Sequence, residues 1–494
     1  MKYEIVIGLE VHSQLLTASK MFCSCNSQYQ GLEPNTVVCP VCMGMPGTLP
    51  VVNLKAVELA ISTGLALQCE IDERTKFDRK NYPYPDLMKG YQISQYDKPI
   101  ATSGILEIQV DGLTKPIRIN RVHMEEDVAK LSHSQDGGEF SYSLLDINRA
   151  GIPLMEIVSE PDLRSPEEAR AYLISLRSIL QYINVSTANM EEGNFRCDAN
   201  ISLKQFSDKE LGPKVEIKNM NSFRAVYTAL TYEKQRQIQL IEEDGEIKQE
   251  TRGWLDDKEI TVSQRSKEQA SDYRYFPEPD LPMITINTAW VNTIEQTLPE
   301  LPQKRAERFT NSYNLSLDDA KSLTISKQKA DFFESVIKEK EQIGIVTKEL
   351  AKSICNWVLG EMTRLLNNSS TNIENTKISP SQLMDLIQLV ETGRLSTGMA
   401  RTVFEKMFVS GESPTAISDK LGLVQISDTS IVEKAVSEVI DNNSKPVADF
   451  LNGKDTALKF LVGQVMKKTK GNANPKIVGE ILTEKLNSLK NISG

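Results

Sequence analysis

The sequence predicts an α+β fold, with a β-rich first part, an α-helical second part and a small helical tail. Segments of alternating or β-branched residues crowd the chain up to about residue 290, and the composition shifts near Pro299. Beyond that point nearly every segment has apolar residues at helical spacing. A chain of 494 residues is also too long for a single hydrophobic core. We therefore expect domains over residues 1–292, 293–410 and 411–494.

The first part combines strands with a few helices. Alternation predicts strands over residues 3–12, 104–110, 116–123, 152–158, 195–203 and 214–219. Helices are expected over residues 54–67 and 223–240, and a third begins after Ser165. Ser165 can cap that helix, Pro166 suits its first turn, and Glu168 would complete a capping box.

The second part and the tail are expected to be helical. Apolar spacing predicts helices over residues 302–312, 327–341, 347–366, 380–392 and 398–408, with a polar loop at 367–372. Shorter helices follow Gly411. From Lys454 to the end, eight lysines stand against three acidic residues, a net charge of +5, although the whole chain carries −10. That balance argues against wholesale electrostatic binding of nucleic acid and favours a local basic face.

The overall composition indicates a soluble globular protein of the cytoplasm. Hydrophobic residues make up 40% and charged residues 25% of the chain, which is ordinary for this class. No apolar run approaches the roughly 18 residues that a membrane span needs, and the start enters a strand pattern with no signal peptide. Seven cysteines are too sparse for a disulfide framework.

Four of those cysteines form two close pairs, Cys23 with Cys25 and Cys39 with Cys42. Two such pairs on turns can supply the four tetrahedral thiolates that a structural Zn²⁺ prefers. The alternative is four reduced thiols without a metal, and the density of cysteines favours zinc. Cys69, Cys197 and Cys355 fall in apolar settings and are expected in the core.

The first strand places Glu10 and His12 on one face, because side chains alternate along a strand. A carboxylate and an imidazole at this spacing suit a metal site, whereas a lone histidine is usually structural. Three consecutive carboxylates, Glu125 to Asp127, follow another strand. These acids either join the same site or form a solvated acidic turn.

Residues 195–203 form the most informative strand. One face is apolar, and the other carries Arg196, Asp198 and Asn200. This row suits a cleft, with arginine for phosphate, aspartate for a metal and asparagine for a substrate. Glu216 and Lys218 share a face of the next strand. Arg149 is a further candidate, and surface salt bridges remain the alternative for the whole set.

The usual phosphate-binding loops are absent from the sequence. It contains neither GxxxxGK[ST] nor a GxGxxG after a strand, and no GxSxG motif. A phosphoryl-transfer enzyme can instead bind nucleotide through Mg²⁺ held by carboxylates, with Arg and Lys on the phosphates. The polar strand faces fit that mode.

Several long motifs resemble one family, the B subunits of the aspartyl/glutamyl-tRNA(Asn/Gln) amidotransferases. The resemblance runs almost end to end and is densest up to about residue 285. It is carried by IGLEVH (7–12), VCPVCMGMPGTLP (38–50), FDRKNY (77–82), GYQISQ (90–95), HMEED (123–127), PLMEIVSEPD (153–162) and SDYRYFPEPD (271–280).

The resemblance implies a reaction on Glu misattached to tRNA(Gln), on Asp misattached to tRNA(Asn), or on both. ATP, as co-substrate, phosphorylates the side-chain carboxylate, and ammonia converts the acyl phosphate to the amide. Ammonia comes from the glutaminase, which is the separate A subunit, and the small C subunit completes the heterotrimer. The family's fold is a cradle related to glutamine synthetase.

The resemblance also assigns residues. Glu10, His12, Glu125, Glu156 and Asp198 match the Mg²⁺ and phosphate set, to which strand parity adds Arg196, Asn200 and Lys218. The tail resembles a tRNA-reading domain, in which Lys467, Lys468, Lys470 and Lys476 are the expected contacts. Val128-Ala129 stands where the family has Ala-Gly, which puts the turn geometry in question but not the carboxylates.

Two other interpretations of the chain remain open at this point. One is a free-standing ligase that acts on a small amino acid, and the other is a non-catalytic RNA-binding adapter. The basic tail and the lack of a plausible glutaminase favour the amidotransferase interpretation.

Overall fold

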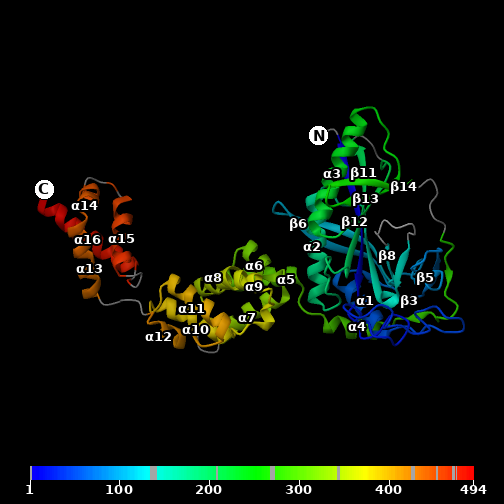
Figure 1. The fold of residues 1–494 in the computed structure, drawn as a ribbon, viewed down its shortest axis with the longest axis horizontal. Coiled ribbons are helices and arrows are strands. Elements are labelled where there is room, and N and C mark those ends of the chain that lie inside the picture. The colour runs from blue at the N-terminus through cyan, green and yellow to red at the C-terminus, as the bar shows by residue number, and fades with distance from the viewer. Residues whose placement is uncertain are drawn as a thin grey trace. The chain divides into compact units, whose positions relative to one another are not determined.

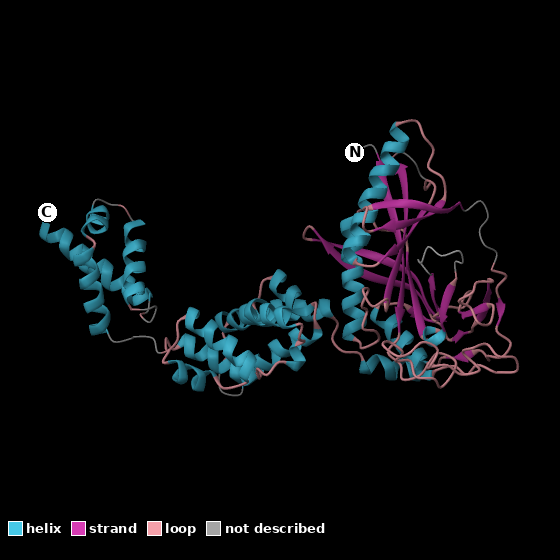
Figure 2. Cartoon of the chain, viewed as in Figure 1, coloured by secondary structure: helices cyan, strands magenta, loops and turns pink. Residues whose placement is uncertain are grey.

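The computed structural model describes residues 3–133, 142–206, 210–266, 273–341, 345–423, 429–451, 454, 456–469, 473 and 475–493. It divides into two compact units, Met1–Pro302 and Gln303–Gly494 (Figure 1). The first unit combines a large sheet with helices, and the second is helical throughout its described elements (Figure 2). The α+β prediction is confirmed at this level.

The first unit is built on a 12-stranded sheet. Ten strands follow the order β14-β13-β12-β11-β1-β10-β7-β5-β4-β15, and β6 pairs with both β7 and β2. Only β12 and β13 among its described pairs run parallel. The strands are β1 (Tyr3–Gln14), β2 (Glu70–Ile71), β4 (Asp78–Asn81), β5 (Tyr91–Ser94), β6 (Ala101–Val110), β7 (Leu113–Glu126), β10 (Pro153–Ser159), β11 (Phe195–Gln205), β12 (Val215–Met220), β13 (Glu250–Leu255), β14 (Ile260–Ser266) and β15 (Phe276–Pro277).

Two small strand pairs and a short 3₁₀ turn complete the β structure of this unit. One pair joins β3 (Arg74–Thr75) to β16 (Ile284–Thr285), and the other joins β8 (Lys130–His133) to β9 (Ser143–Asp146). The 3₁₀ turn η1 (Ile147–Arg149) leads from β9 toward β10. The six predicted strands all exist, and the sequence reasoning missed the shorter ones and the β13–β14 hairpin.

Helices pack against the sheet and bury its apolar face. α1 (Leu54–Ala66) contacts β7, α2 (Pro166–Tyr182) contacts β6, and α3 (Phe223–Glu242) contacts β11. α4 (Thr288–Thr297), which was not predicted, packs on α1. Ile7, Leu9 and Val11 of β1 belong to the resulting core. Strand alternation therefore turns Glu10 and His12 away from that core.

The start of α2 confirms one capping prediction and corrects another. The Ser165 hydroxyl accepts the N–H of Glu168, and Pro166 opens the helix. The Glu168 carboxylate accepts the N–H of Arg164 instead of that of Ser165. The capping box is thus incomplete, because Glu168 reaches one residue too far back and also pairs with Lys115.

The second unit consists of helices around two separate apolar clusters, one from Ala306 to Ile417 and one from Val432 to Leu486. The predicted helix over 347–366 continues through a π turn to Ser369, so the polar loop starts later than expected. The elements are α5 (Pro302–Tyr313), α6 (Leu317–Thr324), α7 (Lys327–Glu341), α8 (Lys348–Trp357), η2 (Val358–Met362), α9 (Thr363–Ser369), η3 (Ile373–Asn375), α10 (Pro380–Glu391), α11 (Thr397–Ser410), α12 (Pro414–Leu421), α13 (Thr429–Asn442), α14 (Ser444–Leu451), α15 (Thr456–Lys468) and α16 (Pro475–Ser493).

None of the helices in the described ranges is both long and apolar enough to cross a membrane.

Candidate active site and cysteine cluster

A row of polar side chains crosses four neighbouring strands of the sheet. The strand registers pair Arg196 of β11 with His12 of β1, His12 with Glu156 of β10, and Glu156 with His123 of β7. Two residues before His12 on β1, Glu10 pairs with Asp198 of β11. Side chains that face each other across paired strands are about 5 Å apart at Cβ, so the register itself brings these groups together.

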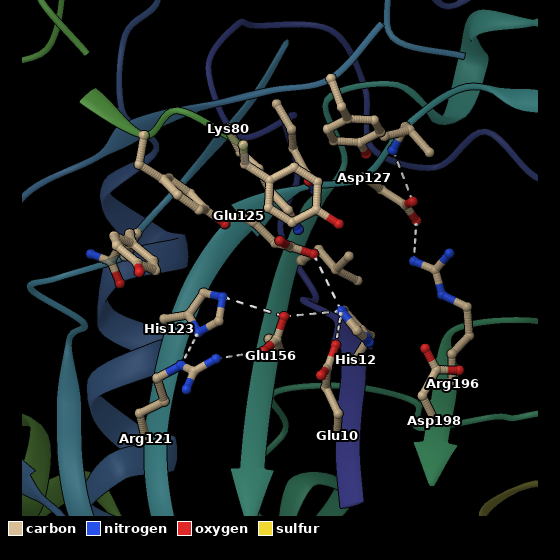
Figure 3. A pocket seen from close by; sticks show the side chains of 18 of the residues that line it. Glu10, His12, Lys80, Arg121, His123, Glu125, Asp127, Glu156, Arg196 and Asp198 are labelled. Carbon is tan, nitrogen blue, oxygen red and sulfur yellow. Dashed lines mark hydrogen bonds and ion pairs between the residues drawn. The ribbon is translucent and has the colours of Figure 1, made fainter. Parts of the chain in front are cut away.

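These side chains line one cavity of about 450 Å³ in the first unit (Figure 3). Eight of the residues predicted from the sequence contribute to its wall: Glu10, His12, Glu125, Glu156, Arg196, Asp198, Glu216 and Lys218. Acidic and imidazole groups that are distant in the sequence thus converge in one trough.

His12 lies at the centre of the acidic groups, as Figure 3 shows. Its Nε2 is 3.2 Å from Glu156 Oε2, 3.5 Å from Glu125 Oε1 and 3.7 Å from Glu10 Oε1. Burial lowers the pKa of His12, but the hydrogen bond to Glu156 and the charges of Glu125 and Glu10 outweigh it and raise that pKa to about 9. Without a metal, His12 is therefore the counter-ion of the cluster.

Glu156 is shared between two histidines and an arginine. Its Oε2 lies 3.4 Å from His123 Nε2, and its Oε1 lies 3.3 Å from Arg121 Nη2. Burial raises the pKa of Glu156, yet its interactions with His123, His12 and Arg121 outweigh burial and hold that pKa below its usual value. Burial lowers the pKa of His123, and there the nearby carboxylates do not compensate. The two histidines thus differ in charge at neutral pH.

Two metal-sized groups of ligand atoms overlap at Glu156. Glu10, His12 and Glu156 offer ligand atoms within 4.8 Å of one another, and so do His123, Glu125 and Glu156. Carboxylate oxygens suit Mg²⁺, and the added imidazoles suit Mn²⁺ as well. The residues therefore fit a divalent cation. Asp198 is in neither group, and its Oδ2 accepts from Lys218 Nζ at 2.7 Å.

Arg196 is held in the cavity wall by a buried carboxylate. Asp127 Oδ2 accepts from Arg196 Nη2 at 2.9 Å and from Gln14 Nε2 at 2.8 Å. Burial raises the pKa of Asp127, but the charges of Arg196 and Arg149 outweigh it and lower that pKa. Asp127 therefore stays ionised and holds the guanidinium of Arg196 in place. This buried ion pair lies next to the polar row and supports it.

Two predicted residues lie outside the cavity wall. Asn200 faces Gly8 and Glu216 across its strand, and its buried Oδ1 has no hydrogen-bond partner among the described residues. Arg149 donates to the carbonyls of Val128 and Ala129 at 2.8 and 2.9 Å. Arg149 thereby braces the turn after Asp127, where the sequence departs from the family pattern.

Several lining residues were absent from the predicted set, although most lie inside the quoted motifs. Motif membership was the available signal for most of them. The short strands and loops have no clear period, whereas Arg121, His123 and Leu154 lie on the predicted strands β7 and β10 and were passed over there. The missed residues are Lys80, Tyr82, Gln92, Gln95, Tyr96, Arg121, His123, Asp127, Val128, Leu154, Tyr273 and Tyr275. Ser271 and Asp272 of the last motif lie outside the described residues.

The four cysteines of the two close pairs form a second, separate group of ligand atoms. The sulfurs of Cys23, Cys25, Cys39 and Cys42 all lie within 4.8 Å of one another. The turn after them needs Gly44, which has a φ of +67° and whose added Cβ would meet Lys89 Cγ at 2.8 Å. The set fits tetrahedral Zn²⁺ and leaves no open position.

A buried lysine favours the thiolate form of Cys42. Lys20 is 0% exposed, and its Nζ donates to the carbonyl of Val37 at 2.9 Å and to Cys42 Sγ at 3.7 Å. The hydrogen bond from Cys23 lowers the pKa of Cys42 to about 4, and the N–H of Cys39 and the charge of Lys20 act in the same direction against burial. Four zinc-bound thiolates would carry a net negative charge, which gives Lys20 its counter-ion.

The other predicted residues fall as follows. Cys69, Cys197 and Cys355 are buried in the apolar clusters, as expected. Lys467 and Lys468 are exposed at the end of α15, where Lys468 pairs with Glu438 of α13. Lys470 lies outside the described residues, and for Lys476 only the backbone is described.

Comparison with known proteins identifies the family. Residues 5–292 match the model of the GatB/GatE catalytic domain, and residues 331–486 match that of the GatB domain. A protein of Dehalococcoides mccartyi (strain CBDB1), named as the B subunit of an aspartyl/glutamyl-tRNA(Asn/Gln) amidotransferase, is 55% identical over 98% of this chain and 99% of its own length. This chain belongs to the family of aspartyl/glutamyl-tRNA(Asn/Gln) amidotransferase B subunits.

Two further members of this family are similar to this chain over their full length. The protein of Carboxydothermus hydrogenoformans is 51% identical over 99% of this chain and 100% of its own. That of Brevibacillus brevis is 49% identical over the same shares. Every described residue that lines the cavity, and all four clustered cysteines, fall within the segment matched by the catalytic-domain model.

Proposed function

We propose that this chain is the subunit that converts Glu-tRNA(Gln), Asp-tRNA(Asn) or both to the amidated aminoacyl-tRNA. The observation that carries the proposal is the row from Arg196 through His12 and Glu156 to His123, inside the segment that matches the catalytic-domain model. Its partners are the glutaminase (the A subunit), which supplies ammonia, and the C subunit. A tRNA substrate of protein synthesis is consistent with a cytoplasmic location.

The reaction has two steps. An oxygen of the misattached side-chain carboxylate attacks the γ-phosphorus of ATP, and ADP leaves. Ammonia then attacks the carbonyl carbon of the acyl phosphate, and inorganic phosphate leaves as the amide forms. Both the attacking carboxylate and the γ-phosphate are anions, so the site must neutralise charge that otherwise repels them.

The residues divide this work by charge. Glu10, His12, Glu125 and Glu156 would hold Mg²⁺, with Asp198 close by, and a bound cation would neutralise the phosphoryl oxygens. Arg196, fixed by Asp127, and Lys218, held between Asp198 and Glu216, present positive charge to the phosphates. Arg149 braces the turn after Asp127 through the carbonyls of Val128 and Ala129, and Asn200 and Arg149 stay predicted contacts of the substrate or nucleotide.

The remaining parts of the chain have supporting roles in this proposal. Residues 1–292 form a cradle related in fold to glutamine synthetase, which the large antiparallel-rich sheet supports. Zn²⁺ on the four cysteines is structural. Residues 293–410 form a helical domain, and residues 411–494 form a tRNA-binding tail, in which Lys467, Lys468, Lys470 and Lys476 are the expected contacts.

Reconstitution tests the proposal. The full chain is combined with the A and C subunits, ATP, glutamine and each misacylated tRNA, and amide formation on the tRNA is measured. We expect ATP- and glutamine-dependent amide with at least one of the two tRNAs. ATP hydrolysis stimulated by free glutamate without tRNA would indicate a small-molecule ligase instead. Amide formation that survives Glu125→Ala would indicate an adapter.

A further inference from the structure

One wall of the cavity is aromatic, and the polar row does not account for it. Tyr82, Tyr273, Tyr275 and Tyr96 form a continuous series of ring contacts, with centroids 5.7, 6.0 and 4.0 Å apart in turn. The last pair, Tyr275 and Tyr96, is stacked face to face with an angle of 5° between the rings. All four line the cavity.

The outermost ring of this series is available to a ligand. Tyr96 is 58% exposed although it borders the cavity. A tyrosine ring held parallel to a neighbour and open on its other face is a ready platform for another flat ring. A solvent-facing aromatic stack has no role in the core of the unit, since none of these four tyrosines belongs to the buried cluster.

The wall is built by the pairing of two distant segments. β15 pairs with β4, with Phe276 opposite Arg79. Asn81 donates its backbone N–H to the carbonyl of Tyr273 at 3.0 Å and its side-chain amide to that of Arg274 at 2.9 Å. Arg274 has a positive φ of 46°, an unfavourable conformation for a non-glycine residue. A strained backbone thus holds Tyr273 and Tyr275 in this wall.

A cation without a carboxylate partner lies against the same rings. Lys80 Nζ is 5.2 Å from the centroid of Tyr273 and 5.9 Å from that of Tyr82. Arg121, Arg196 and Lys218 each have a carboxylate at ion-pair distance. No carboxylate in the described part of the chain is that close to Lys80, so Lys80 can receive an anionic group from a ligand.

We propose that Tyr96, Tyr275 and Lys80 form a subsite for an adenosine phosphate unit, with the base stacked on Tyr96 and the phosphate near Lys80. The inference rests on the proposed function, which offers two sources of this unit: ATP itself and the 3′-terminal adenosine of the misacylated tRNA. Both place a flat base next to an anion, which is the pairing that this wall and Lys80 present.

The test uses the full chain reconstituted with the A and C subunits. Tyr96→Ala removes the platform, and Tyr96→Phe keeps the ring and removes only the hydroxyl. Tyr84→Ala is the matched control, because Tyr84 is 52% exposed and does not line the cavity. The measured quantities are the Kd of ATP, the Kd of inorganic tripolyphosphate, which has no base, and the KM of each misacylated tRNA at saturating ATP.

We expect Tyr96→Ala to weaken the binding of one adenosine-bearing ligand by roughly ten-fold or more, which is the usual effect of losing a base–aromatic stack. A rise in the Kd of ATP, with tripolyphosphate unchanged, assigns the subsite to ATP. A rise in the KM of the tRNA, with ATP unchanged, assigns it to the 3′ end. In either case Tyr96→Phe should keep the Kd and KM values of the unmodified chain. Lys80→Ala should weaken the binding of the same ligand that Tyr96→Ala affects.

The proposal is overturned if Tyr96→Ala changes both ligands no more than Tyr84→Ala does. Because Tyr96 is exposed, its loss should leave the fold intact, and an unchanged melting temperature of Tyr96→Ala checks this directly. Failure of the unmodified complex to form any amide would instead remove the proposed function. The Kd of ATP can still be compared between variants in that event, so the two failures are distinguishable.

Discussion

The cavity and the cysteine cluster are two gatherings of metal-binding side chains in the same unit, built in opposite ways. The cysteines come from two turns within a stretch of 20 residues, Cys23 to Cys42. The cavity groups come from β1, β7, β10 and β11, which meet only through the order and register of the sheet. The cysteine set has the four identical ligands of a filled tetrahedral site. The cavity set combines carboxylates and imidazoles around a space that a ligand can enter.

The difference indicates which of the two groups can take part in catalysis. Four thiolates around a Zn²⁺ would leave no position for a substrate, so the proposed zinc would only stabilise the fold around it. In the cavity, carboxylates, imidazoles, Arg196 and Lys218 face a shared space of about 450 Å³. Variants of the cavity should therefore change rate and leave stability intact, and variants of the cysteines should do the reverse.

The largest expected effect comes from removing a carboxylate of the cavity. Glu125→Ala and Asp198→Ala should each lower phosphorylation of the misattached side chain by on the order of 10³-fold. The first removes a proposed ligand of the cation and the second removes the partner that positions Lys218, so the positive charge that neutralises the phosphoryl group is lost or misplaced. Single-turnover phosphate transfer from ATP measures this, and tRNA binding should be unchanged. Near-normal rates in both variants would remove the distinction between the two clusters.

A smaller effect is expected behind the polar row. Asp127→Asn should lower the same rate by about 10- to 100-fold, because Arg196 loses its fixed charged partner while the cavity wall stays in place. Glu58→Gln is a suitable control, because Glu58 lies outside the cavity wall and pairs with exposed Lys55 on α1. Arg196→Lys should reproduce the loss. Equal rates in Asp127→Asn and Glu58→Gln would show that Arg196 needs no such support.

The cysteine cluster should respond in the opposite sense. The double variant Cys39→Ser/Cys42→Ser should lose about one zinc per chain by metal analysis and lower the melting temperature by on the order of 10 °C. Single-turnover phosphorylation at low temperature should fall only a few-fold. Cys197→Ala, which removes a core cysteine outside the cluster, should keep its zinc. Full zinc content in the double variant would exclude these cysteines as ligands.

The smallest effect on chemistry is expected from the tail, which belongs to neither cluster. A chain cut after Leu423 keeps α12, whose Ile417 packs in the first apolar cluster of the helical unit, and removes the second cluster entirely. It should bind tRNA more weakly and with a shallower dependence on salt, because lysine contacts to phosphates are lost. Filter binding at several salt concentrations measures this. Equal affinities would show that the tail does not read tRNA.

The sequence predicted what depends on local pattern and missed what depends on strand order. CxC and CxxC spacing singled out the cysteines, and alternation placed Glu10 with His12 and Arg196 with Asp198 on shared faces. Nothing local indicates that β1 lies between β10 and β11, which is what brings Glu156 to 3.2 Å from His12. For Glu156 the family motif, not the strand period, was the signal.

The missed residues of the aromatic wall share a physical cause. Lys80 and Tyr82 lie on or beside the four-residue strand β4, and Tyr273 and Tyr275 precede the two-residue strand β15. Elements this short have no period to recognise, and only their pairing across about 200 residues forms the aromatic wall. Asn200 lies outside the cavity wall for a related reason: strand parity gives the face of a residue but not where the cavity ends along the strand.

The most direct test of the central claim is to locate a divalent cation in the cavity. Mn²⁺ can stand in for Mg²⁺ in crystals of the complex, where its anomalous scattering marks its position. We predict a peak beside the carboxylates of Glu10 and Glu156 and the imidazole of His12, lost in Glu156→Gln and kept in Glu216→Gln. A peak elsewhere in the unit, or one that persists in Glu156→Gln, would contradict the account.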